Sequence, residues 1–285
     1  MLENPASPTT SIPLVTLPST LGDQEQAILQ RLESLQELTE NEIQEYRNSG
    51  DGMTLPEDLT VSIVIPVYNE EATIAKVVTR VAALPFNKEI IIVDDCSTDK
   101  TPEVLERLED IKGVVIIRKE ENAGKGAALR TAFENSTGDI VVVQDADLEY
   151  DPKDIPKLLV PIAKEECDVV YGSRFIGEEQ QDESFIHRFG NAFLTKSLNW
   201  MIGLKLTDME TCYKAFRGDI IRKLDVKQNR FGIEPEITAK LARRGFSFSE
   251  VPISYNARTY AEGKKIGVRD LFNALWCICR YGFCD

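Results

Sequence analysis

The chain has 285 residues, of which 42% are hydrophobic and 28% charged, as in an ordinary soluble globular protein of one large or two small domains. Its net charge is −14, but residues 1–60 alone hold 11 acidic and 2 basic side chains, so the remainder is only mildly acidic. Neither part offers the basic face that non-specific binding to nucleic acid requires, and we expect no nucleic-acid partner.

None of the six cysteines forms a CxxC pair, and the single histidine is His187. A zinc site is therefore not expected, and a reducing compartment is indicated. The N-terminus lacks a basic segment followed by an apolar core, and no run of 18 apolar residues occurs. These features predict a cytoplasmic protein whose contact with the inner face of a membrane would be peripheral.

The first 58 residues form a separate region by composition. Residues 1–20 are rich in Pro, Ser and Thr and are typical of a disordered tail. Residues 22–47 place apolar side chains at helical spacing among acidic positions, and residues 48–58 are typical of a linker. The predicted helix at 22–47 suits packing on its own domain, binding a protein partner, or self-association. Residues 59–285 are predicted to form the main domain.

A regular alternation of strands and helices begins near residue 60. Short β-branched runs are separated by helical stretches at 71–83, 100–109 and 124–135, and a further helix near 153–164 precedes a strand at 168–171. The runs suit strands buried on both faces of a sheet and lie at 61–66, 89–93, 114–117 and 139–143. This order predicts an α/β fold with a doubly wound, mostly parallel sheet, whose ligands bind beyond the carboxyl ends of the strands.

The first strand ends in Pro66, which is expected to terminate it, and Asn69 is expected to cap the following helix. These structural roles do not explain Tyr68. Glu70 could be explained by the favourable interaction of a glutamate with a helix N-terminus. The second strand ends at residues 93–99, which include two adjacent acids. Capping accounts for one acid only, and the other is suited to accept a base N–H or a ribose hydroxyl.

Residues 122–128 follow the third strand and combine small residues with Lys125, which suits an anion near a helix N-terminus. The segment is not a Walker A loop, because Gly126 stands where Ser or Thr is required. The fourth strand ends in Asp145 and Asp147, which a buried strand holds together at the ligand edge. Oxygen ligands without a nearby Cys or His select Mg²⁺ or Mn²⁺, and such an ion completes its shell with substrate phosphates.

Five motifs occur in order at these strand ends, and in combination they resemble the family 2 glycosyltransferases of GT-A fold. The most similar branch contains dolichyl-phosphate mannose synthase and related polyprenyl-phosphate glycosyltransferases, and the resemblance spans about residues 60–281. The motifs lie at 65–70, 93–99, 122–126, 145–147 and 172–175. The resemblance implies a nucleotide-sugar donor and a lipid-phosphate acceptor.

The resemblance also implies roles for residues at the donor site. Pro66, Tyr68 and Glu70 resemble contacts to the nucleoside, Asp95 resembles the acid that meets the base or ribose, and Lys125 would lie near the nucleotide. Asp145 and Asp147 resemble the metal and diphosphate site. Glu149 stands where the family places a further metal contact, often Gln. Arg258 and Lys264 resemble residues of a loop that closes over the diphosphate.

At the acceptor side, Arg174 and Arg188 resemble arginines that hold a lipid phosphate, although a pair of surface charges would also explain them. Residues 208–214 occupy the place of a family segment, and Cys212, Tyr213 and Lys214 depart from its pattern, which leaves the acceptor open. Residues 268–281 carry an apolar stripe with basic flanks, which suits either a membrane interface or packing on the domain. Glu234 and Glu236 begin a helix, for which the helix dipole is a sufficient explanation.

These residues predict an inverting, metal-dependent transfer by in-line attack of an acceptor oxygen. A phosphate acceptor needs no general base, whereas a sugar hydroxyl would need Asp208 or Glu210. One alternative is transfer to a soluble glycan or small molecule. Another, of a different class, is a non-catalytic scaffold that binds a nucleotide-sugar. The residues do not specify the base or the sugar.

Overall fold

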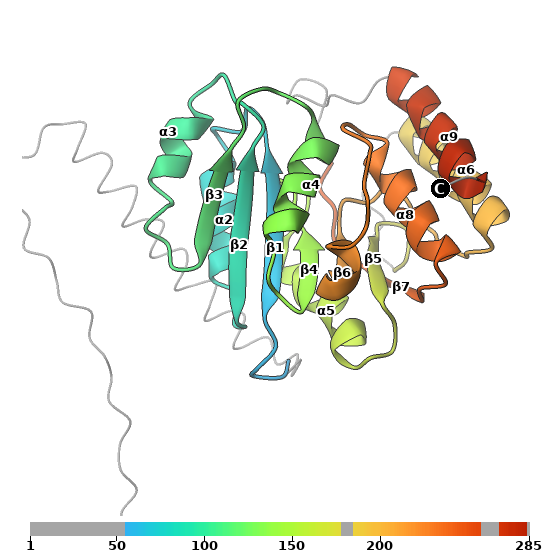
Figure 1. The fold of residues 1–285 in the computed structure, drawn as a ribbon, viewed down its shortest axis with the longest axis horizontal. Helices are drawn as coiled ribbons and strands as arrows, with labels where there is room; N and C mark the ends of the chain where they lie inside the picture. The colour runs from blue at the N-terminus through green and yellow to red at the C-terminus, as the bar shows by residue number, and fades with distance from the viewer. Residues whose placement is uncertain (1–54, 178–184, 258–267, 284–285) are drawn as a thin grey trace, which may run out of the picture. The chain divides into compact units, whose positions relative to one another are not determined.

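The computed structural model describes residues 55–177, 185–257 and 268–283 (Figure 1). They form one seven-stranded sheet in the order β3-β2-β1-β4-β6-β5-β7, in which β6 is antiparallel to its neighbours β4 and β5. The remaining neighbours pair in parallel. The strands are β1 (Val61–Val67), β2 (Lys88–Asp94), β3 (Val114–Arg118), β4 (Ile140–Val143), β5 (Val169–Ser173), β6 (Lys214–Arg217) and β7 (Phe248–Pro252).

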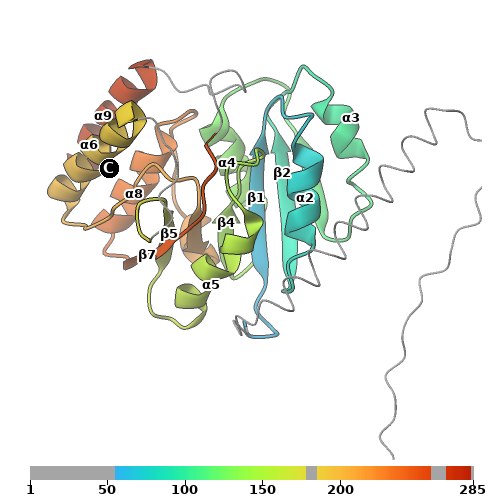
Figure 2. The ribbon, with the colours of Figure 1, turned by 180° about the vertical axis from the view of Figure 1, so that it is seen from behind.

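Helices cover both faces of this sheet. Helix α4 lies in front of the sheet beside β1 in Figure 1, and α2 lies in front of β2 in the reverse view of Figure 2. The helices are α2 (Ile74–Ala82), α3 (Thr101–Glu106), α4 (Lys125–Asn135), α5 (Ile155–Ala163), α6 (Phe185–Ile202), α7 (Gly218–Ile221), α8 (Ile233–Arg243) and α9 (Val268–Phe283), with a 3-10 turn η1 (Pro152–Asp154). The predicted α/β class and mostly parallel sheet are confirmed. Elements β6, β7 and α6 were not predicted.

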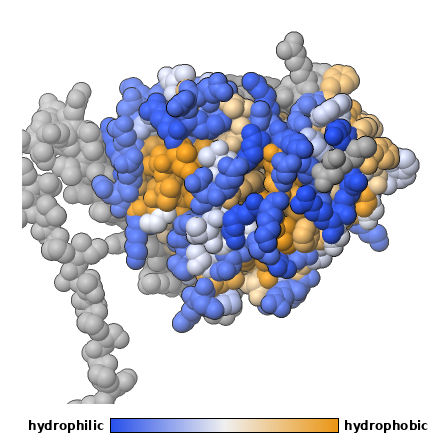
Figure 3. Space-filling view, in the orientation of Figure 1, coloured by the Kyte–Doolittle hydropathy of each residue, from blue (hydrophilic) through white to orange (hydrophobic). Residues whose placement is uncertain are grey.

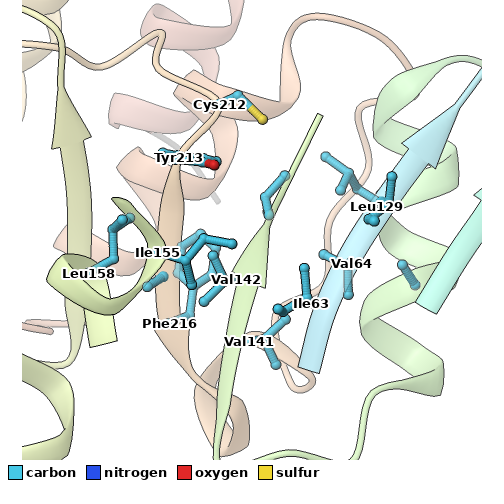
Figure 4. Close-up of a cluster of buried hydrophobic side chains, with 14 of the residues drawn as sticks. Ile63, Val64, Leu129, Val141, Val142, Ile155, Leu158, Cys212, Tyr213 and Phe216 are labelled. Atoms are coloured by element: carbon cyan, nitrogen blue, oxygen red, sulfur yellow. The ribbon is translucent and has the colours of Figure 1, made fainter. Parts of the chain in front are cut away.

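The main core lies where the β-branched strands meet the helices. Figure 4 shows Val141 and Val142 of β4 between Ile63 of β1 and Phe216 of β6, and all four side chains are fully buried. Burying a side chain of this size contributes roughly 1.5–3 kcal/mol, so these contacts hold the three strands β1, β4 and β6 together. The central strands therefore form a rigid platform for the loops at their ends.

A second, smaller apolar cluster lies where α6, α8 and α9 pack together. Leu194 and Leu198 of α6 meet Cys277, Ile278 and Tyr281 of α9 there. Of the two alternatives for residues 268–281, packing on the domain is therefore realised by one face of α9. None of the helices within the described ranges is both long and apolar enough to cross a membrane.

The carboxyl ends of β1, β2 and β4 meet at one edge of the sheet, because these strands are parallel. Antiparallel β6 begins at that same edge, with Lys214 opposite Tyr171 near the end of β5. The loops after β1, β2, β3 and β4, and the segment that enters β6, are therefore brought together. This edge holds the motifs that the sequence singled out.

Candidate active site

The loops after β1 and β2 are joined by hydrogen bonds from short polar side chains. The backbone N–H of Asn69 donates to Oγ of Ser97 at 3.0 Å, and Oδ1 of Asn69 accepts from the N–H of Thr98 at 2.8 Å. Asn69 has a φ of 55°, in the left-handed region that Asn tolerates better than most residues. The predicted helix cap was wrong, since Thr73 is the N-cap residue of α2. Asn69 instead holds the two loops together.

Pro66, Tyr68 and Glu70 lie at this first strand end. Pro66 is buried inside β1, which continues to Val67, so the proline does not terminate the strand as predicted. Tyr68 and Glu70 are half-buried in the loop that follows. Oε2 of Glu70 accepts from Oγ1 of Thr73 at 2.8 Å, which fixes the carboxylate at the start of α2.

Asp95 is anchored by the loop after β3. Its Oδ1 lies 2.7 Å from Nζ of Lys119 and accepts from the N–H of Ala123 at 3.1 Å, and its Oδ2 accepts from the N–H of Gly124. Asp95 is only 2% exposed, so these contacts compensate the cost of burying its charge. The residue expected to meet a base or ribose thus also fixes the loop that carries Lys125.

The glycines on either side of Lys125 allow the segment that precedes α8 to approach. Gly124 has a φ of 99°, and a Cβ there would lie 2.5 Å from the carbonyl oxygen of Asn229. A Cβ on Gly126 would collide with the carbonyl oxygen of Gln228. The small residues of this segment therefore allow the backbone of residues 228–229 to approach closely. This packing fixes where α4 begins and where Lys125 points.

Lys125 lies between two carboxylates from distant parts of the chain. Its Nζ is 2.9 Å from Oδ1 of Asp145 and 3.6 Å from Oε1 of Glu234. Burial acts to lower the pKa of Lys125, but Asp145 and Glu234 together hold it well above its usual value, so the side chain stays charged. The structure thus places a fixed positive charge beside Asp145, the first aspartate of the segment Asp145-Ala146-Asp147, which we refer to as the DxD segment.

Asp147 and Glu149 are positioned by hydrogen bonds within their own loop and to Tyr255. Oδ1 of Asp147 accepts from the N–H of Glu149 at 3.1 Å, and Oε2 of Glu149 accepts from the hydroxyl of Tyr255 at 3.0 Å. In the part of the chain that the structure describes, no group of three or more His, Cys, Asp or Glu side chains is placed to hold a metal ion. Asp145 and Asp147 still fit an ion such as Mg²⁺, which takes one or two carboxylates plus substrate phosphates.

Residues 212–213, which depart from the family pattern, form hydrogen bonds with residues on either side of the DxD segment. The hydroxyl of Tyr213 donates to Oε1 of Gln144 at 2.6 Å, and Nε2 of Gln144 donates to the carbonyl of Asp145 at 2.9 Å. The N–H of Cys212 donates to the hydroxyl of Tyr150 at 3.1 Å. The Tyr213 side chain thus fixes the backbone of Asp145 through Gln144, whereas position 212 holds Tyr150 through its backbone N–H.

Arg174 and Asp208 form a buried pair at the end of β5. Nε of Arg174 is 2.7 Å from Oδ2 and its Nη2 is 2.9 Å from Oδ1, and Nδ2 of Asn191 also donates to Oδ1 at 2.8 Å. Burial acts to raise the pKa of Asp208, but the Arg174 charge and these hydrogen bonds hold it below its usual range. Asp208 is therefore poorly suited to be a general base, and its observed contacts orient Arg174.

Arg188 and Arg174 both lie against the ring of Phe175. The guanidinium carbon atoms of Arg174 and Arg188 are 5.6 Å and 5.8 Å from the centroid of the Phe175 ring, within the range of cation–π contacts. Arg174 also lies 4.9 Å from the ring of Tyr255. The two arginines that the sequence paired are thus brought together from β5 and α6.

Glu210 is the second residue predicted as a candidate base. Its Oε1 is buried and, among the described residues, has no hydrogen-bond partner, and the same holds for Oε2 of Glu234. Burial, and after it the neighbouring Glu234, raises the pKa of Glu210 to about 8, against the opposing charges of Lys214 and Arg174. Of the two candidates, Glu210 has the pKa that general acid–base chemistry near neutral pH requires.

Glu234 is the residue of this site that the sequence prediction missed. It was attributed to the dipole of α8, as was Glu236, but the two side chains differ in the structure. Glu236 is fully buried, accepts from the N–H groups of Lys227 and Gln228 and pairs with Lys240, whereas Glu234 lies against Lys125. No local sequence signal separates the two glutamates, because the difference depends on contacts made across the fold. Arg258 and Lys264 lie outside the described residues.

The family described as glycosyl transferase family 2 matches residues 62–225 of the chain. Among curated relatives, an undecaprenyl-phosphate 4-deoxy-4-formamido-L-arabinose transferase of Aeromonas hydrophila subsp. hydrophila is 32% identical over 222 residues, which cover 76% of this chain and 65% of the relative. A low-salt glycan biosynthesis hexosyltransferase of Haloferax volcanii is 30% identical, with 75% and 53% covered. A dodecaprenyl-phosphate galacturonate synthase of Rhizobium johnstonii is 27% identical, with 73% and 62% covered. The chain thus spans just under two thirds or less of these relatives' length.

Solved structures support the fold. Glucosyl-3-phosphoglycerate synthase of Mycobacterium tuberculosis in complex with UDP has a TM-score of 0.63 at 20% identity, with 80% of this chain and 82% of that chain covered. Another structure of that enzyme, in complex with Mg²⁺ and UDP, has a TM-score of 0.61 at 20% identity, with 85% and 84% covered. At this identity the likeness establishes a shared GT-A-like architecture and no more.

Proposed function

Because the chain belongs to glycosyl transferase family 2, we propose that it transfers a sugar from a UDP- or GDP-sugar to a polyprenyl phosphate, with inversion at the anomeric carbon. The observation that carries the proposal is the contact of Lys125 with Asp145, 2.9 Å apart at the carboxyl edge of the sheet. It places an acidic pair suited to a cation beside a basic group suited to phosphate. A nucleotide diphosphate with its metal ion needs both.

The donor would bind across the ends of β1, β2 and β4. Tyr68, Glu70 and Asp95 stand where a nucleoside would lie, and Lys125 would contact the diphosphate. Asp145 and Asp147 would hold Mg²⁺ or Mn²⁺, which when bound neutralises charge on the diphosphate. Glu149 remains a proposed further contact. The Mg²⁺ and UDP of the structural neighbour agree with this arrangement but belong to that protein.

The acceptor phosphate would bind at Arg174 and Arg188. A guanidinium has five N–H donors, of which the side chain of Asp208 takes two from Arg174. Arg188 adds a second charge 5.8 Å from the centroid of the same Phe175 ring. Two of these curated relatives bear names that specify a polyprenyl-phosphate acceptor, which supports the proposal that the two arginines bind such a phosphate.

In the proposed step, a phosphate oxygen of the acceptor attacks the anomeric carbon from the side opposite the diphosphate. The new carbon–oxygen bond forms as the bond to the diphosphate breaks, and the nucleoside diphosphate leaves with that electron pair. No proton has to be removed, because the acceptor phosphate is already an anion. Lys125 stabilises the charge that develops on the leaving group. We propose the same for Arg258 and Lys264 from a closing loop.

The test is to incubate the protein with Mg²⁺ or Mn²⁺, a panel of UDP- and GDP-sugars, and polyprenyl phosphate in detergent. Labelled sugar should enter the lipid phase, and Asp147→Asn should abolish this transfer. Product confined to the aqueous phase after addition of soluble glycans would favour the soluble-acceptor alternative. Donor binding without transfer or donor hydrolysis would favour a non-catalytic scaffold.

A further inference from the structure

Tyr255 contacts both the donor side and the acceptor side of the candidate active site. Its hydroxyl donates to Oε2 of Glu149 at 3.0 Å, and the guanidinium carbon of Arg174 lies 4.9 Å from the centroid of its ring. Glu149 is on the donor side, because its N–H donates to Oδ1 of Asp147 at 3.1 Å. Arg174 is on the proposed acceptor side. One side chain therefore joins the two sides.

The segment that carries Tyr255 follows β7 and is bound to the loop after β4. Residues 150 and 255 form an isolated antiparallel β-bridge, and the rings of Tyr150 and Tyr255 lie 5.1 Å apart. The N–H of Asn256 donates to the carbonyl of Glu149 at 2.8 Å. Two consecutive residues thus hold Glu149, one through its carboxylate and the other through its backbone.

Tyr255 is only 6% exposed, although it lies at the edge of the sheet where charged ligands would bind. Figure 3 shows mainly hydrophilic surface above the carboxyl ends of β2 and β3 at that edge. A buried tyrosine hydroxyl needs a hydrogen-bond partner, and an ionised acceptor gives a stronger bond than a neutral one. The bond to Oε2 therefore restricts the orientation of the half-buried Glu149 carboxylate.

The ring of Tyr255 acts on Arg174 in a different way. A guanidinium over the face of a tyrosine ring is attracted by the electrons of the ring, and the attraction is stronger where water is excluded. The side chain of Arg174 is 11% exposed, and Asp208 accepts two of its N–H groups. The carboxylate and the ring together limit the orientations that the guanidinium can take.

We propose that Tyr255 is a positioning residue that keeps Glu149 and Arg174 in a fixed relation to each other. Its hydroxyl orients the carboxylate proposed as a further metal contact, and its ring orients the guanidinium proposed to bind the acceptor phosphate. This role rests on the proposed function, because both groups matter only where a metal-bound donor meets an anionic acceptor. The two parts of the side chain act on different ligands, so mutation can separate them.

Two substitutions make that separation. Tyr255→Phe removes the hydroxyl and should weaken Mn²⁺ binding about tenfold, as is usual when a group that orients a metal ligand is lost. It keeps the ring and should leave the affinity for geranyl phosphate, a short prenyl phosphate, unchanged. Tyr255→Leu removes both parts and should also weaken geranyl phosphate binding about fivefold. Electron paramagnetic resonance measures Mn²⁺ binding and calorimetry measures geranyl phosphate binding, each without turnover.

A double variant tests whether the hydroxyl acts through Glu149. If it does, the loss of Mn²⁺ affinity in Tyr255→Phe disappears once Glu149 is replaced with Ala, and the two losses are not additive. Tyr171→Phe is the matched control. The Tyr171 hydroxyl is also buried but bonds to Oγ1 of Thr238 at 2.7 Å, in α8. Its removal should leave both affinities unchanged, and thermal unfolding verifies that each variant is folded.

Native Mn²⁺ affinity in Tyr255→Phe, or additive losses in the double variant, would overturn the role of the hydroxyl. Native affinity for geranyl phosphate in Tyr255→Leu, or an equal loss in both Tyr255 variants, would overturn the role of the ring. The proposed function fails separately, if the native protein binds neither Mn²⁺ nor geranyl phosphate. A native protein that binds both, with Tyr255 variants that bind them equally well, refutes the positioning role alone.

Discussion

The guanidinium of Arg174 and the carboxylate of Asp208 form a two-point contact, with Nε 2.7 Å from Oδ2 and Nη2 2.9 Å from Oδ1. Asp208 is fully buried and the side chain of Arg174 is 11% exposed, so water does little to weaken the pair. The N–H of Arg174 also donates to Oδ2 of Asp208 at 3.1 Å. Asp208 therefore fixes both the backbone and the side chain of the arginine at the end of β5.

Replacing Asp208 with Asn should impair acceptor binding more than donor binding. The substitution keeps the shape but leaves the Arg174 charge without its buried partner, which costs about 3 kcal/mol of unfolding free energy. We expect the KM for polyprenyl phosphate to rise at least about tenfold while the affinity for the nucleotide-sugar stays within about threefold. Denaturant unfolding and steady-state kinetics measure the two effects.

The matched control is Asp219→Asn, which alters a second Arg–Asp pair. Arg217 and Asp219 are 3.1 Å apart, but both side chains are about half exposed. Exposed pairs contribute less than about 1 kcal/mol, so this variant should be near native in stability and kinetics. An equal loss of donor and acceptor binding in Asp208→Asn would argue against a specific role in orienting Arg174.

Replacing Lys125 with Gln should strengthen metal binding in the absence of donor. The Lys125 ammonium lies 2.9 Å from Asp145 and competes for the carboxylate that a cation would use. Removing a positive charge this close should raise the affinity for Mn²⁺ at least about tenfold, while the affinity for nucleotide-sugar falls. Titration followed by electron paramagnetic resonance measures the first effect and calorimetry the second.

Lys119→Gln is the control for that experiment. Its ammonium pairs with Asp95 at 2.7 Å, at the next strand end, so its removal should leave Mn²⁺ affinity unchanged. If both variants gained affinity equally, the effect would reflect overall charge and not the contact of Lys125 with Asp145.

The sequence could predict the strands that are uniformly apolar, because burial on both faces leaves a clear signal. This holds for β1, β2 and β4, whose order also places Asp95, Lys125 and Asp145 at one edge. Strands β6 and β7 were missed because Lys214–Arg217 and Phe248–Pro252 mix polar and apolar residues. Helix α6 was missed because apolar residues lie on both its buried and its exposed face.

The partners of site residues could not be predicted, because they lie far apart in the chain. Asp208 meets Arg174 from 34 positions away, and Glu234 reaches Lys125 from beyond β6. Asn69 shows the same limit, because its partners lie 28 and 29 positions away. Its sequence position suits a helix cap, but the loop after β2 supplies Ser97 and Thr98, and the asparagine bonds to them instead.

Replacing Gly126 with Ala should displace the segment that packs on α4. The new Cβ would collide with the backbone carbonyl of Gln228, which cannot move away as a side chain could. We expect a loss of about 2 kcal/mol in unfolding free energy, within the range for overpacking, and a weaker donor affinity because Lys125 is adjacent. Thermal unfolding and donor titration test this.

The control is Gly190→Ala in α6, where a Cβ would have no neighbour within 4 Å. Alanine is favoured over glycine inside a helix by up to about 1 kcal/mol, so this variant should be equally or more stable. If Gly126→Ala had native stability and native donor affinity, neither property would depend on the close approach of residues 228–229 to α4.

Replacing Glu210 with Gln should change the pH dependence of stability. Folding raises the pKa of Glu210 from 4.5 to about 8, so the folded protein holds the proton more tightly than the unfolded chain. The contribution of this proton to the unfolding free energy is fully present below about pH 4.5 and is lost as the pH rises to about 8. Glu210→Gln should therefore raise the unfolding free energy above about pH 8 and change it little below about pH 5. Exposed Glu103→Gln should leave the profile unaltered.

The same variant separates the two classes of acceptor. A sugar hydroxyl must lose a proton, and loss of a general base typically lowers kcat by about 10²–10⁴-fold. A phosphate acceptor has no proton to lose, so Glu210→Gln should keep kcat with polyprenyl phosphate within about tenfold of native. The pH–rate profile provides the second readout, because the limb near pH 8 should vanish in the variant only if Glu210 titrates in the reaction. A loss of about a thousandfold with polyprenyl phosphate, together with disappearance of that limb, would contradict attack by an acceptor anion and assign Glu210 as the base for a hydroxyl acceptor.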